Sequence, residues 1–496
     1  MKGIGEPMLE DVARVQHQRA RRRLLYGQWE EDAIRRIYAR LGNVRRQAVG
    51  FPDLSANPFR AVCHQAAVLY DREPRISHPD DGKDRGASKF LASKLRQALW
   101  ASKMQRVQRD CIGLREVLVR ADVTEVGGLV LRPVFPDRVD ATPDELEPDQ
   151  PGTIREARPR VFGKNGRAQW TYDEIDPSSR SYVVKAEDGA VVTAAAVGGK
   201  ASGESYPFEW SDGTAFLPYT MYHATPVGQL WDPWELRELV EATYEACVLW
   251  TFWSHCVRDA SWPQRWAEGV EVAGTNTEGQ PSAPRQSVTT DPATVLMFRR
   301  IGGDMGGSPQ IGQWQPGADP QVLAEALMIY EQRLAAYAGV SDPDFIRRSG
   351  DPRSGYALAI SRDGQRAAAR KFEPQFRAGD LDLLCKCAAL LNRHERTVGF
   401  EADEEYVELP ESGWVLRYPG LPLTPDEQDA KRRNVLELLD RGLISRARAY
   451  AEIHELELEE AEAELEDIPD PRAGAAVSAG ENGAGALANG AGVAHG

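Results

Sequence analysis

The sequence predicts an α+β protein that is mainly helical, and three observations support this prediction. Long segments in both halves of the chain have apolar residues at helical spacing. Between about Val126 and Tyr222 the chain instead has short alternating runs separated by Gly, Pro and Asp-Pro turns, which are typical of strands. The run TPDE that begins at Thr424 has the residues of a capping box, with proline at the first helical position. With 496 residues, the chain is expected to form two to four structural units.

The composition is ordinary, with 42% hydrophobic and 27% charged residues. No run of about eighteen apolar residues occurs, so no membrane span is expected. The N-terminus lacks the apolar centre of a signal peptide, which predicts synthesis in a cytoplasm without export. The six cysteines are scattered and form no CxxC motif, so no disulfide framework is expected. Cys385 and Cys387 are interpreted as buried thiols rather than metal ligands, and no metal site or cofactor is assigned.

The formal net charge of −15 is unevenly distributed. From Glu401 to Asp467 there are 20 acidic against 7 basic residues, whereas the first 46 residues carry 11 basic against 6 acidic. The acidic balance of the whole chain argues against nonspecific coating of nucleic acid. The C-terminal acidity is interpreted either as a solvated surface or as a rim that another molecule passes without sticking.

The N-terminal region is predicted to be helical. Residues 8–42 are expected to form one long helix that carries an arginine cluster, Arg19 and Arg21–Arg23. Asn57, which is followed by proline, is a favourable N-cap for a second helix that stops before Pro74. A further helical stretch is expected over Ser88–Arg120.

The β-rich stretch, residues 126–222, is expected to form a small barrel or sandwich. Asp232, with proline and glutamate in the turn that follows, predicts the start of an aromatic-rich helix that runs to about Asp259. The aromatic side chains of this helix are interpreted as core residues. Ser261–Gly317 is predicted to be loop and strand, with Val295–Arg300 as the best strand. This segment lies between two helices and is expected to project from both.

The central helix is predicted over Ala318–Ala338. Its apolar residues recur at spacings of four and three, which defines one seam of an α-helix. The seam consists of Leu323, Leu327, Tyr330, Leu334 and Tyr337. Val322, Ala326 and Ile329 extend the apolar stripe sideways, so more than one neighbour is expected to pack against this helix.

A polar loop follows the central helix. Gly339–Gly355 contains two prolines that prevent a continued helix, and Tyr356–Arg370 resumes a helical pattern. The loop carries Arg347, Arg348 and Arg353. These arginines are interpreted either as solvated surface residues or, because the loop lies at the tip of a helical hairpin, as contacts to a phosphate backbone.

Helices dominate the remaining chain. Phe376–Arg396 is predicted to be a helix and Trp414–Tyr418 a short strand. The capped helix that starts at Thr424 is expected to end at Gly442. An acidic helix is predicted from Ser445 to Pro469, and the Gly/Ala/Asn-rich residues 469–496 are expected to be disordered.

No catalytic motif is found. The sequence has no Walker A motif, no GxGxxG, no GxSxG elbow and no Cys/His signature. Asp403, Glu404 and Glu405 have the chemistry of a general acid and base, but in so acidic a region they are interpreted as solvated surface residues. The sequence therefore predicts a protein that is not an enzyme.

The order of these parts resembles that of bacteriophage portal proteins, which form the ring at one vertex of a tailed-phage capsid. The resemblance covers about residues 50–468, and its most characteristic run is Tyr330–Gln365. Supporting runs are NPFRAVCHQAAVLYDREP from Asn57, the helix around Trp231–His255, and LPLTPDEQDAKRRNVLELLDRGLIS from Leu421. A β-rich insert comes first, and a projecting segment lies between two long helices, in the same order as in that family.

The resemblance implies a portal-like subunit with a β-rich wing insert, long stem helices, a clip, a tunnel loop and a helical crown. These subdomains would be residues 1–225 (wing), 226–261 (stem helix), 262–316 (clip), 317–338 (stem helix), 339–354 (tunnel loop), 355–400 (wing return helices), 401–468 (crown) and 469–496 (disordered tail).

The resemblance also implies a function. A portal ring is the channel for packaging and ejection of viral DNA. The implied partners are other copies of the chain in a dodecameric ring, double-stranded DNA, the terminase large subunit, a head-tail adaptor, and the major capsid and scaffolding proteins, with no membrane. The implied location is the portal vertex of the virion, after assembly in the host cytoplasm. Arg347, Arg348 and Arg353 would face the DNA. The seam from Leu323 to Tyr337 would lie at the subunit interface.

Two other functions remain as alternatives. One is a cytoplasmic hydrolase that uses an acidic pair on the β-rich unit, which predicts a closed pocket and turnover of a substrate. The other is a different minor head protein of a virion. The position of the gene would distinguish it, because genes for portals lie beside a terminase gene.

Overall fold

The computed structural model describes most of the chain. No helix within the described part is long and apolar enough to cross a membrane. The described residues are 12–41, 52–81, 85–157, 161–162, 168–185, 191–196, 206–232, 236–261, 265–268, 270–272, 298–300, 310–313, 319–337, 355–400, 406–421, 423–454, 456, 458, 461–462 and 465.

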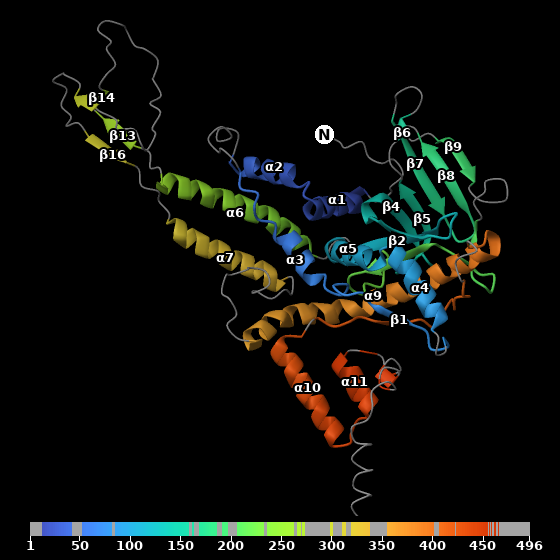
Figure 1. Ribbon diagram of the computed structural model, residues 1–496. Coiled ribbons are helices and arrows are strands. Elements are labelled where there is room, and N and C mark those ends of the chain that lie inside the picture. Colours follow the sequence, from blue (N-terminus) through green and yellow to red (C-terminus); the bar gives the residue numbers. More distant parts are fainter. Residues whose placement is uncertain are drawn as a thin grey trace, which may run out of the picture. The chain divides into compact units, whose positions relative to one another are not determined.

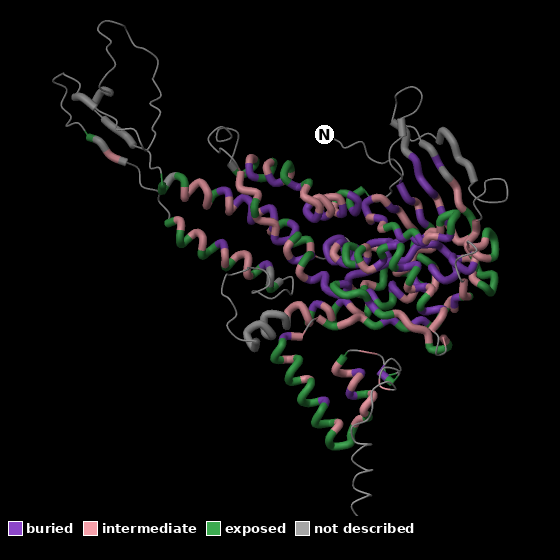
Figure 2. Tube along the Cα trace, in the orientation of Figure 1, coloured by how far each residue is buried: buried purple, intermediate pink, exposed green. Residues whose placement is uncertain are grey.

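The chain folds as two compact units. One consists of Met1–Ser349 and Arg362–Leu421, and the other of Gly350–Ser361 and Pro422–Gly496. The larger unit combines helices with several small sheets, all of them antiparallel in the described part (Figure 1). This confirms the predicted α+β class. Buried residues concentrate in one core, which contains residues of the N-terminal helices, of the strands that follow residue 115 and of the long helix that begins at Gly355 (Figure 2).

The N-terminal region contains two helices, α1 (Val12–Tyr26) and α2 (Glu30–Leu41). The prediction of one helix over residues 8–42 is therefore wrong. Gly27 has a φ of +79°, a left-handed conformation that ends α1 and that glycine adopts without strain. Trp29, which follows, is buried in the core and so helps to fix the start of α2.

Helix α3 (Pro58–Ala66) begins as predicted. The side chain of Asn57 accepts a hydrogen bond from the backbone N–H of Arg60 at 2.9 Å, which satisfies one of the free donors of the first turn. The helix ends at Ala66, several residues before Pro74.

The predicted helical stretch Ser88–Arg120 is wrong in its extent, because the structure has three elements there. They are α4 (Gly86–Gln97), α5 (Trp100–Leu114) and β2 (Glu116–Val123). Leu99 and Arg115 have φ values of +55° and +75°, and each residue interrupts the helical path. Burial of β2 in the core outweighs the local helical pattern, as Val117 and Val119 are almost inaccessible to solvent.

Among the described residues, the β-rich stretch contains two antiparallel sheets of three or more strands. The first has the strand order β12-β2-β3, where β3 is Leu129–Val134 and β12 is Tyr219–His223. The second has the order β4-β5-β7-β8-β9, and β6 pairs with β7. Its strands are β4 (Val139–Pro143), β5 (Pro151–Ala157), β6 (Val161–Phe162), β7 (Ala168–Ile175), β8 (Arg180–Lys185) and β9 (Val191–Ala196). Leu118 of the first sheet and Ile154 and Ile175 of the second belong to one buried cluster, so the two sheets share an apolar core.

An ion-pair network also joins the two sheets. The guanidinium of Arg120 on β2 lies 3.4 Å from the carboxylate of Asp173 on β7 and 3.8 Å from that of Glu156 on β5. The hydroxyl of Tyr219 on β12 donates a hydrogen bond to Glu156 at 2.7 Å, and burial raises the pKa of Tyr219. Loss of one partner would leave a buried charge unpaired, so the network favours a single arrangement of the sheets.

Two short strand pairs complete this part of the fold. Strand β17 (Val415–Arg417) pairs with β1 (Arg75–Ser77), which confirms the strand predicted at Trp414–Tyr418. Strands β10 (Phe208–Glu209) and β11 (Ala215–Phe216) form a hairpin before β12.

Helices α6 (Arg237–Ser261) and α7 (Pro320–Tyr337) lie side by side and antiparallel (Figure 1). The indole Nε1 of Trp253, near the end of α6, donates a hydrogen bond to the carbonyl of Pro320 at the start of α7, at 3.0 Å. We call this pair the α6–α7 arm. The segment between the helices contains paired strands: β13 (Arg265–Glu268) with β16 (Gln310–Gln313), and β14 (Val270–Val272) with β15 (Phe298–Arg300).

The predicted helix start at Asp232 is wrong, because α6 begins at Arg237 after Leu236, whose φ is +61°. Asp232 makes tertiary contacts instead of capping the helix. Its backbone N–H donates to the carboxylate of Glu116 at 3.3 Å, and its own carboxylate lies 3.9 Å from the guanidinium of Arg115.

One helix, α9 (Gly355–Thr397), replaces the two helices predicted over Tyr356–Arg370 and Phe376–Arg396. Pro374 lies inside α9, where it removes one backbone hydrogen bond. Pro374 is exposed, whereas the phenylalanines two positions before and after it are buried in the core. Packing on both sides of the proline therefore outweighs the lost hydrogen bond.

The smaller unit contains α10 (Pro425–Asp440) and α11 (Arg446–His454). The predicted capping box is present. The backbone N–H of Glu427 donates to Thr424, and the backbone N–H of Thr424 donates to the carboxylate of Glu427 at 2.8 Å. Gly442 follows α10 with a φ of +71°, as expected for a helix terminus.

Helix α11 follows Ser445, whose hydroxyl accepts a hydrogen bond from the backbone N–H of Arg448 at 3.1 Å. The prediction of a continuous acidic helix to Pro469 is wrong, because α11 ends at His454 and Leu456 is not helical. The predicted disordered tail, residues 469–496, lies outside the described residues.

Candidate functional site

The three arginines predicted to contact DNA lie outside the described residues, because the structure describes nothing between 338 and 354. Arg347, Arg348 and Arg353 therefore remain predictions. Asp403, Glu404 and Glu405, which were interpreted as solvated surface residues rather than as a general acid and base, also lie outside the described residues.

The apolar seam of α7 packs inside the chain. Leu327 and Leu334 are buried, with 6% and 9% of their surface exposed, and α7 packs against α6 and α3. The hydroxyl of Tyr330 donates a hydrogen bond to the carbonyl of Ala242 on α6 at 3.4 Å. Leu323 is half-buried. The side chain of Tyr337, the last residue of α7, is not among those that the structure describes. The two leucines assigned to a subunit interface thus contact this chain's own helices.

A second apolar stripe on α7 is exposed. Val322 and Ile329 have 60% and 53% of their surface exposed, and Ala326 between them is exposed as well. Positions 322, 326 and 329 are spaced by four and three residues, so their side chains lie on one face of the helix. The residues that extend the apolar stripe sideways therefore form an exposed surface on α7, and no described part of the chain covers it.

Polar contacts fix the α6–α7 arm as a rigid pair. The indole Nε1 of Trp250 donates a hydrogen bond to the carboxylate of Glu331 at 2.8 Å, and burial raises the pKa of Glu331. The rings of Trp250 and Trp253 meet edge to face, with centroids 5.2 Å apart. Not every aromatic residue of α6 is buried as predicted, since Phe252 is 42% exposed.

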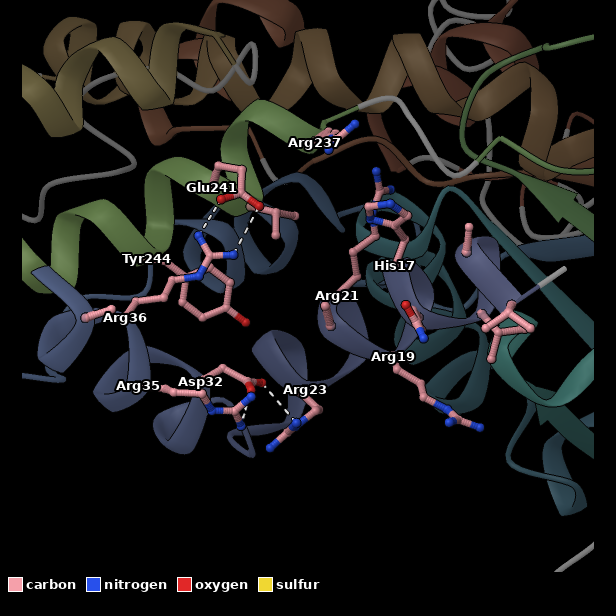
Figure 3. A pocket seen from close by; sticks show the side chains of 17 residues that line it. His17, Arg19, Arg21, Arg23, Asp32, Arg35, Arg36, Arg237, Glu241 and Tyr244 are labelled. Atoms are coloured by element: carbon pink, nitrogen blue, oxygen red, sulfur yellow. Dashed lines mark hydrogen bonds and ion pairs between the residues drawn. The ribbon is translucent and has the colours of Figure 1, made fainter. Parts of the chain in front are cut away.

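A concave surface, which we call the basic groove, lies among α1, α2 and α6 (Figure 3). Its volume is about 860 Å³. Six arginines and two carboxylates line it, together with small apolar residues. The charged lining residues are Arg19, Arg21, Arg23, Asp32, Arg35, Arg36, Arg237 and Glu241.

Ion pairs order the α2 side of the groove. The guanidinium of Arg36 makes a two-point contact with the carboxylate of Glu241 and lies over the ring of Tyr244, 4.2 Å from its centroid (Figure 3). Asp32 lies 3.0 Å from Arg23 and 3.1 Å from Arg35. The hydrogen bond from Arg36 lowers the pKa of Glu241 and raises that of Arg36. These contacts hold the arginine side chains in place around the opening.

The deepest cation of the groove is Arg21, which is 2% exposed. Burial lowers the pKa of Arg21 to about 10, and its guanidinium donates a hydrogen bond to the carbonyl of Gly113 at 3.3 Å. Burial also raises the pKa of the neighbouring Glu116 to about 8. Gln18 donates a hydrogen bond to Glu116 at 2.6 Å. The floor of the groove is therefore anchored to the helical core.

A buried carboxylate connects α9 to three other parts of the larger unit. Asp380 on α9 accepts hydrogen bonds from the hydroxyls of Tyr70, Tyr222 and Tyr418, at 2.7, 2.8 and 2.6 Å. Burial raises the pKa of Asp380 to about 6, although the three hydrogen bonds oppose that change. Because the carboxylate of Asp380 is fully buried, the cluster acts as a structural joint.

The cysteines of α9 fit the interpretation as thiols. Cys387 is buried and Cys385 is half-buried, and burial raises the pKa of Cys385 to about 11. Within the described ranges, the structure brings together no group of three or more His, Cys, Asp or Glu side chains that would suit a metal ion.

Sequence reasoning identified the arginines of α1 but missed the groove. The groove arises because α2 and α6, some 200 positions apart in the chain, place Arg36 and Glu241 in contact. The available signal was the excess of basic residues in the first 46 positions, a local reversal of the chain's acidic charge.

Comparison with family models and with curated proteins found no match to this chain.

Proposed function

We propose that the protein is a subunit of a bacteriophage portal ring, a non-enzymatic channel through which viral DNA is packaged and ejected. The observation that supports this proposal most strongly is the two-faced character of α7. One face is buried against α6 and α3, whereas Val322, Ala326 and Ile329 form an exposed apolar stripe on another face. A helix with two apolar faces suits a subunit that packs head to tail around a closed ring.

The order of the elements also supports the proposal. The antiparallel α6–α7 arm would be the pair of stem helices, and the paired strands β13–β16 between them would belong to the clip. The N-terminal helices and the two sheets would form the wing, with α9 as the returning helix. Helices α10 and α11 would belong to the crown. Residues 339–354, between α7 and α9, would be the tunnel loop.

The proposal assigns partners according to these parts. The clip would dock the terminase motor during packaging and a head-tail adaptor afterwards, while the wing would contact the capsid and scaffolding proteins. Double-stranded DNA would pass through the centre. The acidic C-terminal region, with 20 acidic and 7 basic residues between Glu401 and Asp467, would repel DNA and let it slide.

Negative-stain microscopy of the purified full-length protein tests the proposal. We expect closed rings with a central channel. In Ile329→Glu, a charge in the exposed stripe should abolish or strongly reduce ring formation without lowering the melting temperature of the protomer. Leu146→Glu is the matched control, because Leu146 is an exposed apolar residue on a different surface, at 92% exposure.

Particles that remain monomers or small dimers under every assembly condition would contradict the ring. If rings form equally well in Ile329→Glu and in Leu146→Glu, the exposed stripe of α7 is not the subunit contact.

A further inference from the structure

We propose that a groove beside α9 binds an arginine-bearing peptide segment of a partner protein. The groove has a volume of about 540 Å³ and lies among the β4–β5 loop (residues 144–150), the segment from Phe216 to His223, and α9. We call it the acidic groove. This inference goes beyond the ring proposal and does not depend on it, because the exposed stripe of α7 contributes no residue to this groove.

The charge of the acidic groove is the first argument. Its charged lining residues are four carboxylates and one cation: Asp144, Glu147, Asp149, Asp382 and Lys386. The cation is already used, because the Nζ of Lys386 lies 2.6 Å from the carboxylate of Asp382. The other three carboxylates form no ion pair with a described lysine or arginine, and that of Asp144 accepts backbone N–H groups. A concave surface lined by one sign of charge attracts a ligand of the opposite sign.

A buried acceptor in the lining points to a ligand that carries N–H donors. His223 on β12 lines the groove, and only 7% of its surface is exposed. Because a carbonyl can only accept, the Nε2 of His223 donates to the carbonyl of Asp149 at 3.0 Å, and burial lowers the pKa of the ring, which favours the neutral form. Nδ1 of the neutral ring is then an acceptor, and it has no hydrogen-bond partner among the described residues. An N–H donor of the ligand would satisfy it.

The spacing of the carboxylates and the apolar lining favour a guanidinium over a metal ion. Within the described ranges, no three His, Cys, Asp or Glu side chains lie close enough together to hold a metal ion, so the negative charge is spread along the groove. Phe216 and Met221 line the same groove. A guanidinium is planar and weakly hydrated, so it can pack on apolar side chains while it makes two-point contacts with a carboxylate.

An exposed leucine at the groove favours a peptide over a small organic cation. Leu146, which lines the groove, is 92% exposed and stands between two glutamates in the β4–β5 loop. The loop is ordered, because Asp144 accepts hydrogen bonds from the backbone N–H groups of Leu146 and Glu147 at 2.8 and 3.2 Å. A ligand with an apolar residue next to its arginine gains from this leucine. The volume also lies within the range of ligand clefts, about 300–1,000 Å³.

Fluorescence anisotropy with the full-length protein tests this proposal. The probe is a short labelled peptide of arginine, leucine and alanine, and the comparison probe has glutamate in place of arginine. We expect the arginine peptide to bind, with an affinity that falls as salt is added. The glutamate peptide should not bind.

Substitution of two groove carboxylates locates the binding. In the double variant Glu147→Gln/Asp149→Asn, the affinity for the arginine peptide should fall by about tenfold, equivalent to about 1.4 kcal/mol. The control, Glu125→Gln/Asp80→Asn, makes the same change in charge at two exposed carboxylates that do not line the groove. It should bind as the wild type does, within about twofold. Thermal melts of both variants verify that they are folded.

A third variant, Leu146→Ala, separates a peptide from a small cation. It should weaken binding of the arginine peptide without lowering the melting temperature, because the leucine is exposed. The proposal is overturned if the wild type does not bind the arginine peptide or if the two double variants bind it equally. It is also overturned if spermine binds with the same dependence on Glu147 and Asp149 while Leu146→Ala binds the peptide as the wild type does, which would make the groove a small-cation site. None of these results affects the ring proposal, whose test is the particle shape seen by microscopy.

Discussion

Asp380 shows how a single buried residue can tie together distant parts of the chain. It sits on α9 and accepts three tyrosine hydroxyls that come from the segment after α3, from β12 and from the segment after β17. The adjacent residue, Gly379, permits this approach, because a Cβ atom there would lie 2.6 Å from the ring of Tyr222. The joint depends on the absence of a side chain at one position and on a carboxylate at the next.

Burial raises the pKa of Asp380 to about 6, so its titration should affect stability. A folded-state pKa above the unfolded value favours the protonated form in the folded protein. The resulting stabilisation is complete below about pH 4 and is lost as the pH rises through about 6. Relative to Asp380→Asn, the wild-type free energy of unfolding should fall by up to about 3 kcal/mol across this interval. Urea unfolding at a series of pH values measures it.

The control for this experiment is Asp382→Asn on the same helix. The carboxylate of Asp382 is 41% exposed, so solvent screens its charge. A constant difference in unfolding free energy between wild type and Asp380→Asn from pH 4 to pH 7 would show that Asp380 does not titrate in this interval.

At the scale of the element, α7 is the helix on which the functional proposal depends. Its spacing of apolar residues predicted more than one packing neighbour. The structure shows that the face with Leu327 and Leu334 is used inside the chain, whereas the stripe with Val322 and Ile329 is not covered by any described residue. The two faces should therefore respond differently to substitution.

Leu327→Ala should destabilise the protomer by about 2–5 kcal/mol, because it deletes buried methyl groups and leaves a cavity between helices. Ile329→Ala removes an exposed side chain and should change the free energy of unfolding by less than about 0.5 kcal/mol. Chemical denaturation of the two variants, at concentrations where the protein is monomeric, provides the comparison. Equal destabilisation by both substitutions would mean that the exposed stripe is covered in solution.

At the scale of the whole molecule, the distribution of charged residues bears on the proposed contact to DNA. Most of the acidity lies between Glu401 and Asp467, while the loop between α7 and α9 carries three arginines and three aspartates and has no formal net charge. In a ring, arginines of this neutral loop at the channel and an acidic region elsewhere would hold DNA locally and prevent it from sticking along its path.

The triple variant Arg347→Ala/Arg348→Ala/Arg353→Ala should assemble rings but package or retain DNA about tenfold less efficiently, because phosphate contacts are lost. Nuclease-protected DNA in a packaging reaction measures this effect. Alanine at Arg432, Arg433 and Arg441, which are exposed on or next to α10, is the control with the same change in charge. Normal packaging by the loop variant would show that its arginines do not contact DNA.

The sequence by itself determined the features that depend on nearby residues. The caps at Asn57 and Thr424 were predictable because each side chain bonds to a backbone N–H three positions later. The β-rich stretch and the helix over Pro320–Tyr337 were predictable from their periodicity. In the proposed site, the extra apolar stripe at Val322 and Ile329 was recognisable for the same reason.

Only the tertiary structure decided which of these surfaces remain exposed. Local pattern cannot reveal that the seam of α7 is already filled by α6 and α3, or that Pro374 is tolerated inside α9, because both depend on packing between residues far apart in the chain. The basic groove has the same origin. Arg36 and Glu241 form one wall only because folding brings α2 onto α6, and burial of neighbouring apolar residues, rather than local propensity, supplies the free energy for that contact.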